Sequence, residues 1–553
     1  MTSTSTVLDY PDTTMAVLPA SMAALYDDRA AVVDGNTTLT FAELDRRSAA
    51  VASALRSAGV ADRDVVLLYL ANSVEFVVAY YGSLRAGATV TLVNPLQPVP
   101  GLRRQVIETG AVVGFTQAEQ STRLLSAAAG TSLATVIVVD AVSPEATTSS
   151  GTAAAEDVRV VPLDGFVTGH HTAPGVSTST DDVAHLAFTG GTTGVSKGVR
   201  VLHRNVLGNV TQMIAWRAGH AVEFGDDGRL RLTPRPGGSR GVVPGDAVTI
   251  VVSPMFHAHA LINLSFLLLC GATTVLAGRF EPGGMLALIE EHRATYLTGS
   301  PAMWHALAVH PDIGTRDLGS VRVVSSGAAP IDLVTLERLE KAFPAAAVVE
   351  GYGLTEATCL VSSAPLTADG EYRLGSVGLP TYDTEVQIRA PHDPGVVLGS
   401  GERGELWVRG PQVTDGYLNQ PELTDAQFVD GWLDTGDIAY RDADGYLYIC
   451  DRAKDMLIYK GYNVYPRELE EILVSHPDVA AAAVVGRDAG AAGQEPVAFC
   501  VARDGHHIDE QAVTVFVAAQ VLPYKKIRDV IVVDELPTTP AGKVQKAALR
   551  GRL

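Results

Sequence analysis

Cysteine is scarce in this sequence, and its four residues are far apart. The sequence has no CxxC pair and no Cys and His spacing typical of a zinc site; its cysteines are Cys270, Cys359, Cys450 and Cys500. We therefore expect buried thiols in a reducing compartment. The first residues, MTSTSTVLDYPDTT, lack the basic start and the apolar stretch of a secretory signal. A cytoplasmic protein is expected.

Basic residues are also few, with 42 Lys and Arg against 62 Asp and Glu, for a net charge of −20. The last 103 residues contain 13 basic and 14 acidic residues, so nearly all of the negative charge lies in the first 450. Nucleic-acid partners are normally met by a basic patch, which this balance argues against. Anionic ligands are repelled least by the C-terminal part.

Long uninterrupted apolar runs are absent. The nearest candidate, residues 261–276, is interrupted by Asn263, Ser265, Gly271 and two threonines, and it is short for the ~20 residues of a membrane span. We expect a buried helix followed by a strand there, and no membrane span. With 47% hydrophobic and 19% charged residues the chain can bury large cores, and 553 residues predict at least two domains.

Helical and strand patterns alternate from residue 39 onward, which predicts a mainly parallel sheet covered by helices. A loose Ser/Thr/Ala/Gly-rich connection is expected near 143–180, and a surface hairpin, either a lid or decoration, within 218–243. The alternating segments are residues 39–59 (helix), 64–70 (strand), 73–87 (helix) and 88–93 (strand).

From about residue 374 the pattern changes to short strands broken by Gly and Pro, typical of a small antiparallel sheet or barrel. Beyond residue 451, Pro466 begins a helix with early acidic residues, followed by strands around a second helix. The expected fold is α/β. A large N-terminal domain (1–450) has mainly parallel sheets covered by helices plus a small β-barrel, and a smaller, mobile α+β C-terminal domain covers 451–553.

The segment HLAFTGGTTGVSKGVRVLHRNV (185–206) reads as an apolar strand, a loop of glycines and hydroxyls, and a helix. Such a loop brings backbone N–H groups and hydroxyls to phosphate oxygens, and Lys197 adds a positive charge. It is not the Walker pattern, because Ser196 precedes this lysine. Taken alone, it could equally be a flexible Gly/Thr turn.

Seven segments in order resemble the motifs of the adenylate-forming (ANL) superfamily, which includes acyl-CoA synthetases, peptide-synthetase adenylation domains and beetle luciferases. The resemblance extends from residue 39 to the C-terminus and is closest to the acyl-CoA synthetase branch. The segments are residues 189–198, SPMFHAHAL (253–261), SSGAAP (325–330), EGYGLTEAT (350–358), GWLDTGD (431–437), DRAKDMLIYKGYNVYP (451–466) and PTTPAGKVQK (537–546).

The resemblance implies a nucleotide site in which Gly327, Ala328 and Tyr352 bound the adenine. Asp437 and Arg452 would hold the ribose hydroxyls, which suits a carboxylate that accepts two hydrogen bonds. Outside the family pattern, Asp437 could cap a turn and Arg452 could form a surface ion pair. The full nucleotide-binding set is Thr189, Gly190, Gly191, Thr192, Thr193, Lys197, Gly327, Ala328, Ala329, Gly351, Tyr352, Gly353, Thr355, Asp437, Arg452 and Lys543.

The resemblance further implies three groups at the reacting phosphates. Glu356 would hold Mg²⁺, which binds few carboxylates besides phosphates and water, and Thr355 would lie near the α-phosphate. Lys543 would be the catalytic lysine, because a cation stabilises charge on the transferring group. Alone, Glu356 could be a helix N-terminal charge and Lys543 a solvated loop lysine. Lys546 carries the positive charge where the family commonly has arginine.

For the acid and the thiol, the resemblance implies an acyl pocket with catalytic His257 beside the carboxylate, lined by Phe256, Gly327 and Gly353. A buried histidine of purely structural role is the alternative for His257, and His259 is assigned no role. Lys454 matches the family's hinge residue. Lys460 and Gly461 match the part of the C-terminal domain that approaches for thiol attack by CoA.

The leading hypothesis is an acyl-CoA ligase that uses ATP, Mg²⁺, CoA and a small carboxylic acid, with a carrier-protein phosphopantetheine as an alternative acceptor. An amino-acid-adenylating enzyme is disfavoured because residues 255–261 contain no Asp. An enzyme of one half-reaction is a rival, since Ser196 stands where the family often has proline and 218–243 lies near the ATP motifs. A non-catalytic nucleotide-binding protein is the third alternative.

Overall fold

The computed structural model describes residues 7–140, 157–189, 197–367, 370–391, 393–460, 462–539 and 543–553. Two large sheets form the N-terminal part, and the first has seven strands that are parallel except for the antiparallel pair β8 and β9. In spatial order they are β7 (Arg159–Pro162), β6 (Thr135–Val138), β5 (Val113–Thr116), β3 (Val65–Tyr69), β4 (Thr89–Leu92), β8 (Val183–Thr189) and β9 (Lys197–Leu202).

The second sheet has nine strands, with parallel pairing in its centre and antiparallel pairing at both ends. In spatial order they are β18 (Leu379–Pro380), β17 (Ser362–Ser363), β16 (Ala347–Tyr352), β15 (Val323–Ser326), β14 (Tyr296–Gly299), β12 (Val248–Val251), β13 (Thr273–Leu276), β1 (Ala30–Asp34) and β2 (Thr37–Thr40).

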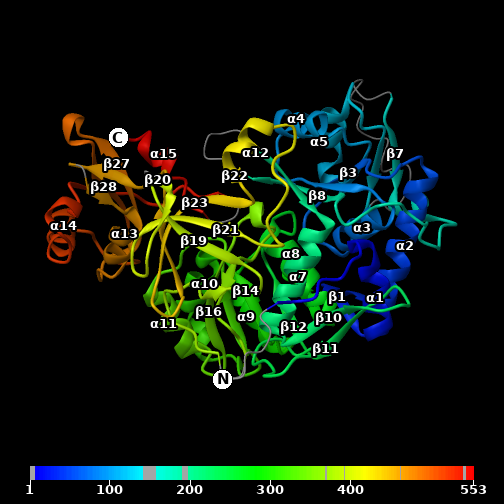
Figure 1. Ribbon diagram of the computed structural model, residues 1–553, viewed down its shortest axis with the longest axis horizontal. Helices are drawn as coiled ribbons and strands as arrows, with labels where there is room; N and C mark the ends of the chain where they lie inside the picture. Colours follow the sequence, from blue (N-terminus) through cyan, green and yellow to red (C-terminus); the bar gives the residue numbers. More distant parts are fainter. Residues whose placement is uncertain are drawn as a thin grey trace.

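Helices fill the space between the two sheets and cover their outer faces (Figure 1). The largest core joins both sheets through α2 (Phe41–Ser57), α3 (Val74–Arg85), α7 (His203–Arg217) and α8 (Ala258–Leu269). The outer face of the first sheet packs on α4 (Val99–Thr109) and α5 (Ala118–Ala128), and that of the second on α9 (Pro282–Glu291), α10 (Pro301–Ala308) and α11 (Leu333–Ala342).

The beginning of α2 illustrates how the sequence sets an element. Thr40 accepts a hydrogen bond from the Glu43 backbone, and the Glu43 side chain accepts one from the Thr40 backbone. This capping box satisfies two N–H groups that a helix start leaves without partners. The predicted helix, strand, helix and strand of residues 39–93 are confirmed as α2, β3, α3 and β4.

The predicted surface hairpin is present as β10 (His220–Phe224) and β11 (Leu230–Pro234). It packs against α1 (Leu18–Tyr26), where Ser21 accepts a hydrogen bond from the Leu230 backbone at 2.9 Å. Figure 1 places this hairpin at the opposite end of the molecule from the C-terminal strands and helices. Of the two alternatives, this position disfavours a lid.

An antiparallel sheet follows, with the strand order β20 (Asp393–Val397), β19 (Glu385–Ala390), β21 (Gly404–Arg409), β23 (Trp432–Arg441) and β22 (Phe428–Val429), and with β24 (Leu447–Arg452) also paired to β23. The antiparallel pairing agrees with prediction. Among the described strands the order is open, so the expected barrel is replaced by an open sheet, since β20 and β22 pair on one side only.

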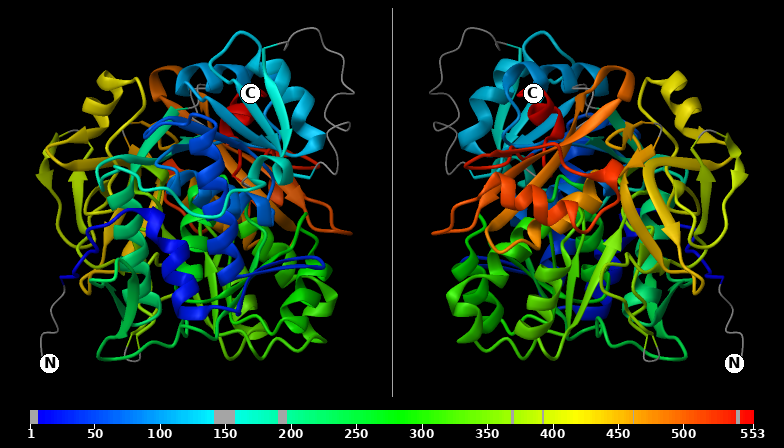
Figure 2. Two further views of the ribbon diagram at one scale, coloured as in Figure 1. Left: turned by 90° about the vertical axis from the view of Figure 1, so that its right-hand side faces the viewer. Right: turned by 90° about the vertical axis from the view of Figure 1, so that its left-hand side faces the viewer.

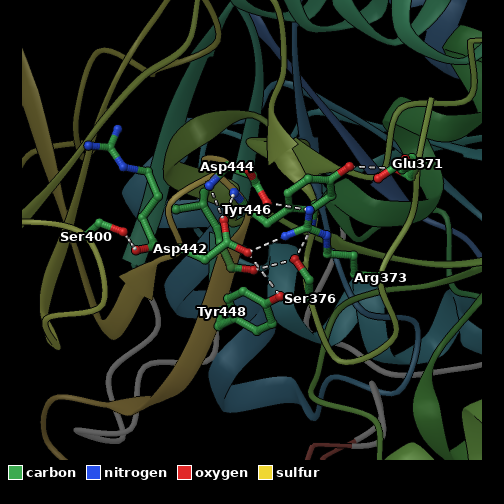
Figure 3. A network of polar contacts seen from close by, with 11 residues as sticks. Glu371, Arg373, Ser376, Ser400, Asp442, Asp444, Tyr446 and Tyr448 are labelled. Carbon is green, nitrogen blue, oxygen red and sulfur yellow. Dashed lines mark hydrogen bonds and ion pairs between the residues drawn. The ribbon is translucent and has the colours of Figure 1, made fainter. Parts of the chain in front are cut away.

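Polar contacts tie this sheet to the chain that follows β17 (Figure 3). Arg373 forms ion pairs of 2.7 Å with both Asp442 and Asp444 in the turn between β23 and β24. Its guanidinium also lies 4.2 Å from the ring centroid of Tyr446, whose hydroxyl donates to the Glu371 carbonyl. These contacts hold β23 and β24 against the nine-stranded sheet.

The C-terminal part has its own three-stranded sheet, with order β27 (Val479–Asp488), β28 (Gln494–Ala502) and β29 (Asp529–Val532). Helices α13 (Pro466–Val474) and α14 (Glu510–Ala518) bury Leu469, Leu473, Val513 and Val517 against it. The hairpin β25 (Leu457–Tyr459) and β26 (Tyr462–Val464) precedes α13, and α15 (Lys546–Arg550) ends the chain, as Figures 1 and 2 show. The predicted α+β arrangement is confirmed.

The predicted helix followed by a strand at residues 261–276 is confirmed as α8 and β13. Across the described ranges, no helix combines the length and the apolar character needed to cross a membrane. All four cysteines are free, and only Cys450 is partly exposed.

Candidate functional site

The glycine- and hydroxyl-rich loop joins two antiparallel strands, because Thr189 at the end of β8 pairs in register with Lys197 at the start of β9. The prediction that this loop leads into a helix is therefore wrong. Val199 and Val201 alternate as in a strand, and α7 begins only at His203. The predicted contacts Gly190, Gly191, Thr192 and Thr193, and Ser196, lie outside the described residues.

Lys197 and Glu356 share one neighbour, Tyr417. The ammonium of Lys197 lies 5.0 Å from the Tyr417 ring centroid, and the Tyr417 hydroxyl donates to Glu356 Oε1 at 2.9 Å. Glu356 belongs to the short 3₁₀ turn η4 (Thr355–Ala357), and its carbonyl accepts hydrogen bonds from the backbone and hydroxyl of Thr414. The predicted phosphate residues Lys197, Thr355 and Glu356 are thus brought together.

Glu356 is a single carboxylate. Within the described ranges, no group of three or more His, Cys, Asp or Glu residues is placed to hold a metal ion by itself. Mg²⁺ commonly uses one or two carboxylates together with substrate phosphates and water. The donor set around Glu356 suits a metal that arrives with a phosphorylated substrate.

Asp437 and Arg452 face each other across β23 and β24, because the two residues pair in register. Arg452 Nε lies 3.1 Å from Asp437 Oδ1, and the Tyr352 hydroxyl donates to Oδ2 at 2.6 Å. Burial raises the pKa of Tyr352, and the Asp437 charge raises it further, so the phenol stays a donor. The three predicted adenosine-side residues therefore form one contiguous group with a buried carboxylate at its centre.

The turn after β15 carries Gly327, Ala328 and Ala329. Ala328 has a φ of 69°, an unusual conformation for a residue with a side chain, and the Gly327 N–H donates to the Gly299 carbonyl at 3.1 Å. In register, the carboxyl ends of β15 and β16 are neighbours, so this turn lies beside Gly351 and Gly353. A Cβ on Gly353 would come within 1.5 Å of the Cys359 carbonyl oxygen. Only glycine fits there.

Lys543 reaches this site from the C-terminal part. The Thr539 N–H donates to the Lys543 carbonyl at 2.8 Å. The residue keeps solvent contact, but surrounding protein disfavours its charge and lowers its pKa. The Arg452 charge lowers the pKa further, while Asp437 and Glu356 oppose the shift. The ammonium therefore stands among the predicted ribose and metal residues.

His257 is the residue just before α8, and its ring lies 4.3 Å from that of Phe256. Burial lowers the pKa of His257 to about 4, and the Lys543 charge contributes. His257 is thus neutral at pH 7 and close to the ammonium. The structure brings the predicted acyl residues Phe256 and His257 to the same site as Lys543.

His259 had no predicted role, yet it lies in the site. Its Nε2 is 3.0 Å from Thr298 Oγ1, and a Cβ on Gly327 would lie 3.2 Å from the same nitrogen. Burial lowers its pKa to about 4, with contributions from Arg217, His257 and Lys543. The only sequence signal for His259 was its position two residues after His257. At the first turn of a helix, that spacing does not predict that both side chains reach the same site.

The hinge and thiol residues lie at two places. Lys454, two residues past the end of β24, has its pKa lowered by burial and by Arg452, so it is close to the nucleotide residues. Lys460 occupies the turn between β25 and β26 with a φ of 51°. Its N–H donates to the Ala492 carbonyl and its ammonium lies over the Tyr459 ring, both in the C-terminal part. Gly461 lies outside the described residues.

Family models match both parts of the chain: AMP-binding enzyme over residues 20–418, and AMP-binding enzyme C-terminal domain over residues 468–543. The chain is 35% identical over 535 residues to 4-coumarate–CoA ligase 5 of Oryza sativa subsp. japonica, covering 95% of this chain and 92% of that protein.

Solved structures agree along the whole length. ATP-bound MatB from Rhodopseudomonas palustris superimposes with a TM-score of 0.82 at 27% identity, over 98% of this chain and 99% of that one. A benzoate CoA ligase from Burkholderia xenovorans LB400 gives 0.81 at 25% identity, over 97% and 100%. Together with the site geometry, these matches show that the chain belongs to the AMP-binding enzymes of the adenylate-forming (ANL) superfamily, in the CoA ligase branch.

Proposed function

We propose that this chain is an AMP-forming acid–thiol ligase: it converts a carboxylic acid and ATP to an acyl-adenylate and pyrophosphate, and then transfers the acyl group to CoA with release of AMP. The observation that carries the proposal is the position of Lys543, which enters from the C-terminal part and stands among Glu356, Asp437, Arg452 and His257. Nucleotide binding alone would not need that ammonium.

In the first half-reaction, the acid's carboxylate attacks the α-phosphorus and pyrophosphate leaves. Both reactants are anions, so a cation fixed beforehand near the transferring group stabilises the transition state. Lys543 would supply that charge, with Lys197 at the other end of the phosphates and Thr355 beside the α-phosphate. Mg²⁺ held by Glu356 would neutralise phosphate charge.

Asp437 would accept hydrogen bonds from the ribose hydroxyls, with Arg452 beside it. Its carboxylate is already oriented by Tyr352 and Arg452, so binding needs little rearrangement. Gly327, Ala328, Ala329, Gly351 and Gly353 would bound the adenine and the acyl group, because their small size leaves the strand ends accessible.

The acid would lie beside Phe256 and His257. A neutral His257 can donate one hydrogen bond to the acid without pairing with it as an ion. This leaves the carboxylate nucleophilic. Lys543, whose charge already acts on this ring, then lies between the acid and the nucleotide.

The second half-reaction would use another face of the C-terminal domain (451–553). We propose that this domain turns about Lys454, next to the end of β24, and presents the Lys460 and Gly461 turn for thiol attack on the acyl carbonyl. The contacts of Lys460 within its own domain fit a surface that is not engaged in the present arrangement.

CoA as the acceptor is supported by the names of the rice and Burkholderia proteins, and a carrier-protein phosphopantetheine is the alternative. The cytoplasm is the proposed location, which suits four free cysteines. An enzyme of one half-reaction is a weaker candidate, because the β10 and β11 hairpin lies at the opposite end of the molecule from the C-terminal strands and helices. Ser196 is then the remaining departure from the family pattern on the ATP side.

The test uses the purified full-length chain with ATP, Mg²⁺ and a panel of aryl, aliphatic and terpenoid acids. We expect pyrophosphate release with at least one acid, and a thioester only when CoA is added. Pyrophosphate release without a thioester would indicate an adenylating enzyme with another acceptor. Thioester formed from synthetic acyl-adenylates, with no acid activated, would contradict the two-step reaction.

A further inference from the structure

Arg217, the last residue of α7, is a buried cation. Its exposed fraction is 2%, and within the described part of the chain it forms no ion pair. Nη1 donates to the Tyr296 hydroxyl and Nη2 to Ser363 Oγ at 3.0 Å, while Nε has no hydrogen-bond partner among the described residues. Arginine stays charged in proteins, so α7 ends in a charge that is enclosed by neutral groups.

The guanidinium lies on the strand ends that carry the site. A Cβ on Gly351 would come 3.3 Å from Arg217 Nη2, just as one on Gly327 would come 3.2 Å from His259. Gly351 and Gly327 follow directly from the pair Glu350 and Ser326, so they are adjacent across β15 and β16. Arg217 and His259 therefore cover two neighbouring glycines, Gly351 of the proposed nucleotide set and Gly327, which also belongs to the proposed acyl pocket. The Arg217 charge contributes to lowering the pKa of His259.

Glu350, the acidic residue on β16 next to Gly351, faces away from Arg217. Side chains alternate across a strand, so Val349 and Gly351 face α7 and α8, whereas Val348 and Glu350 face α11 and the C-terminal part. Glu350 interacts there with Arg467 and Glu471 of α13. The carboxylate next to Gly351 in the sequence, that of Glu350, is thus on the opposite face of the sheet from Arg217.

Hydrogen-bond donors are in excess around Arg217. Besides the free Nε–H, the hydroxyl of Ser363 keeps its proton to donate, because it accepts from Nη2. A buried charge is costly unless it is paired and hydrogen-bonded. A ligand group with several acceptor lone pairs and a negative charge would satisfy both requirements.

Resting on the proposed function, we infer that Arg217 receives a second anionic group at the far end of the acid, so that the substrate class is a carboxylic acid with a remote carboxylate. One carboxylate is then activated beside His257 and Lys543, and the other pairs with the guanidinium. A purely structural arginine, bracing α7 against β14 and β17 through Tyr296 and Ser363, is the competing interpretation.

The test compares matched acids that differ only at the far end: carboxylate, hydroxyl or methyl, in an aliphatic series of increasing length and in para-substituted benzoates. Pyrophosphate release is measured with the full-length chain, Arg217→Met, Arg217→Lys and the control Arg204→Met, whose arginine is exposed on the same helix. Melting temperature and ATP affinity are recorded for each variant.

With the parent chain, we expect the carboxylate-ended member of the best series to exceed its methyl-ended partner at least tenfold in kcat/KM. Arg217→Met should lower kcat/KM for the diacid by about 100-fold and leave the methyl-ended acid equal or better, because only the charged partner is lost. Arg217→Lys should retain part of the preference, and Arg204→Met all of it.

Three results would overturn the inference: a preference of the parent for methyl-ended acids in every series, a preference for the hydroxyl-ended acids over the diacids, or an equal loss for all acids in Arg217→Met. The last result indicates a structural brace. If Arg217→Met does not fold, the inference is tested by the kcat/KM ratio of carboxylate-ended to methyl-ended acids in the parent and in Arg217→Lys. Turnover of methyl-ended acids alone contradicts only this inference, whereas no turnover with any acid contradicts the proposed function as well.

Discussion

Lys543 belongs to the C-terminal part but lies among site residues of the N-terminal part. Its ammonium lies near two cations, Arg452 and Lys454, and near two anions, Asp437 and Glu356. Burial and the two cations lower its pKa, while the carboxylates keep the charged form accessible. The negative charge of a bound nucleotide would raise the pKa of Lys543 again and favour its charged form.

Replacing Lys543 by alanine should slow adenylation by about 100- to 1000-fold, because a preorganised charge at the transferring group is lost. ATP affinity should change much less, since Asp437, Arg452 and Lys197 stay in place. Single-turnover pyrophosphate release and equilibrium ATP binding measure the two quantities. The exposed Lys341 on α11, changed to alanine, is the matched control. Unchanged pyrophosphate release in Lys543→Ala would refute the assigned role.

Gly353 is constrained by the backbone. Because an added Cβ would come within 1.5 Å of the Cys359 carbonyl oxygen, Gly353→Ala should destabilise the fold by about 3 kcal/mol or more. Chemical denaturation measures the change. Gly165, in α6 (Leu163–Val167), has open space at the same position, so Gly165→Ala should stay within about 1 kcal/mol of the parent. Equal stability of the two variants would show that the backbone around residue 353 shifts to accommodate the added Cβ, and would contradict the prediction.

At the scale of elements, β16 has a different environment on each face. Glu350 is buried, its Oε1 has no hydrogen-bond partner within the described ranges, and burial raises its pKa from 4.5 to about 7. The Arg467 charge lowers the pKa only in part. The strand therefore carries an acid that is protonated in the folded chain over a range where the unfolded chain has lost the proton.

The sign of the resulting pH dependence follows from linkage. Between pH 4.5 and about 7 the folded chain holds the proton of Glu350 more tightly, so stability falls as pH rises through this range and the deficit persists above it. Glu350→Gln should remove this deficit, which for such a shift corresponds to about 3 kcal/mol. Denaturation at pH 5 and pH 8 measures it, with the exposed Glu337→Gln on α11 as control. A gain at pH 8 no larger than at pH 5 would contradict the assignment.

The elements themselves were largely predictable, because hydrophobic periodicity and helix-start signals act locally: α2 begins two residues after the predicted start, α8 covers the predicted helical part of the apolar run, and α13 begins at Pro466. The helix expected after the phosphate loop was wrong, since β9 depends on pairing with β8, which the local sequence does not specify. His259 and Arg217 were missed for a related reason. A histidine inside a helix and an arginine in a last helical turn have ordinary local explanations, and only the register of β15 and β16 brings them to the site.

At the scale of the whole molecule, polar contacts at the surface help to dock the C-terminal part. Arg403 lies 5.2 Å from the Tyr465 ring centroid and 3.5 Å from Glu468, and Arg467 donates to the Ile449 carbonyl. The Arg403 and Glu468 ion pair is partly exposed, and such pairs contribute little stability. Such an interface suits a domain that changes its position during a reaction cycle, whereas the sequence alone could not place one domain on the other.

A proline at position 454 tests this rearrangement. Proline fixes its own φ and restricts Ala453, so Lys454→Pro should retain pyrophosphate release and lower thioester formation by about 100-fold or more. The two half-reactions are measured separately, with acid plus ATP and with synthetic acyl-adenylate plus CoA. Lys454→Ala controls for loss of the side chain. Equal impairment of both half-reactions in the proline variant would contradict a hinge at this position.

The pleat of β16 has a consequence for how this protein can diverge. Val349 and Gly351 face α7 and α8, the side of the proposed acid site, whereas Val348 and Glu350 face α11 and the C-terminal part. A substitution at one set need not disturb the other, although both lie on one strand of six residues. Mutations that change which acid is bound and mutations that change how tightly the C-terminal part docks can therefore occur at alternating positions of β16 without interfering with each other.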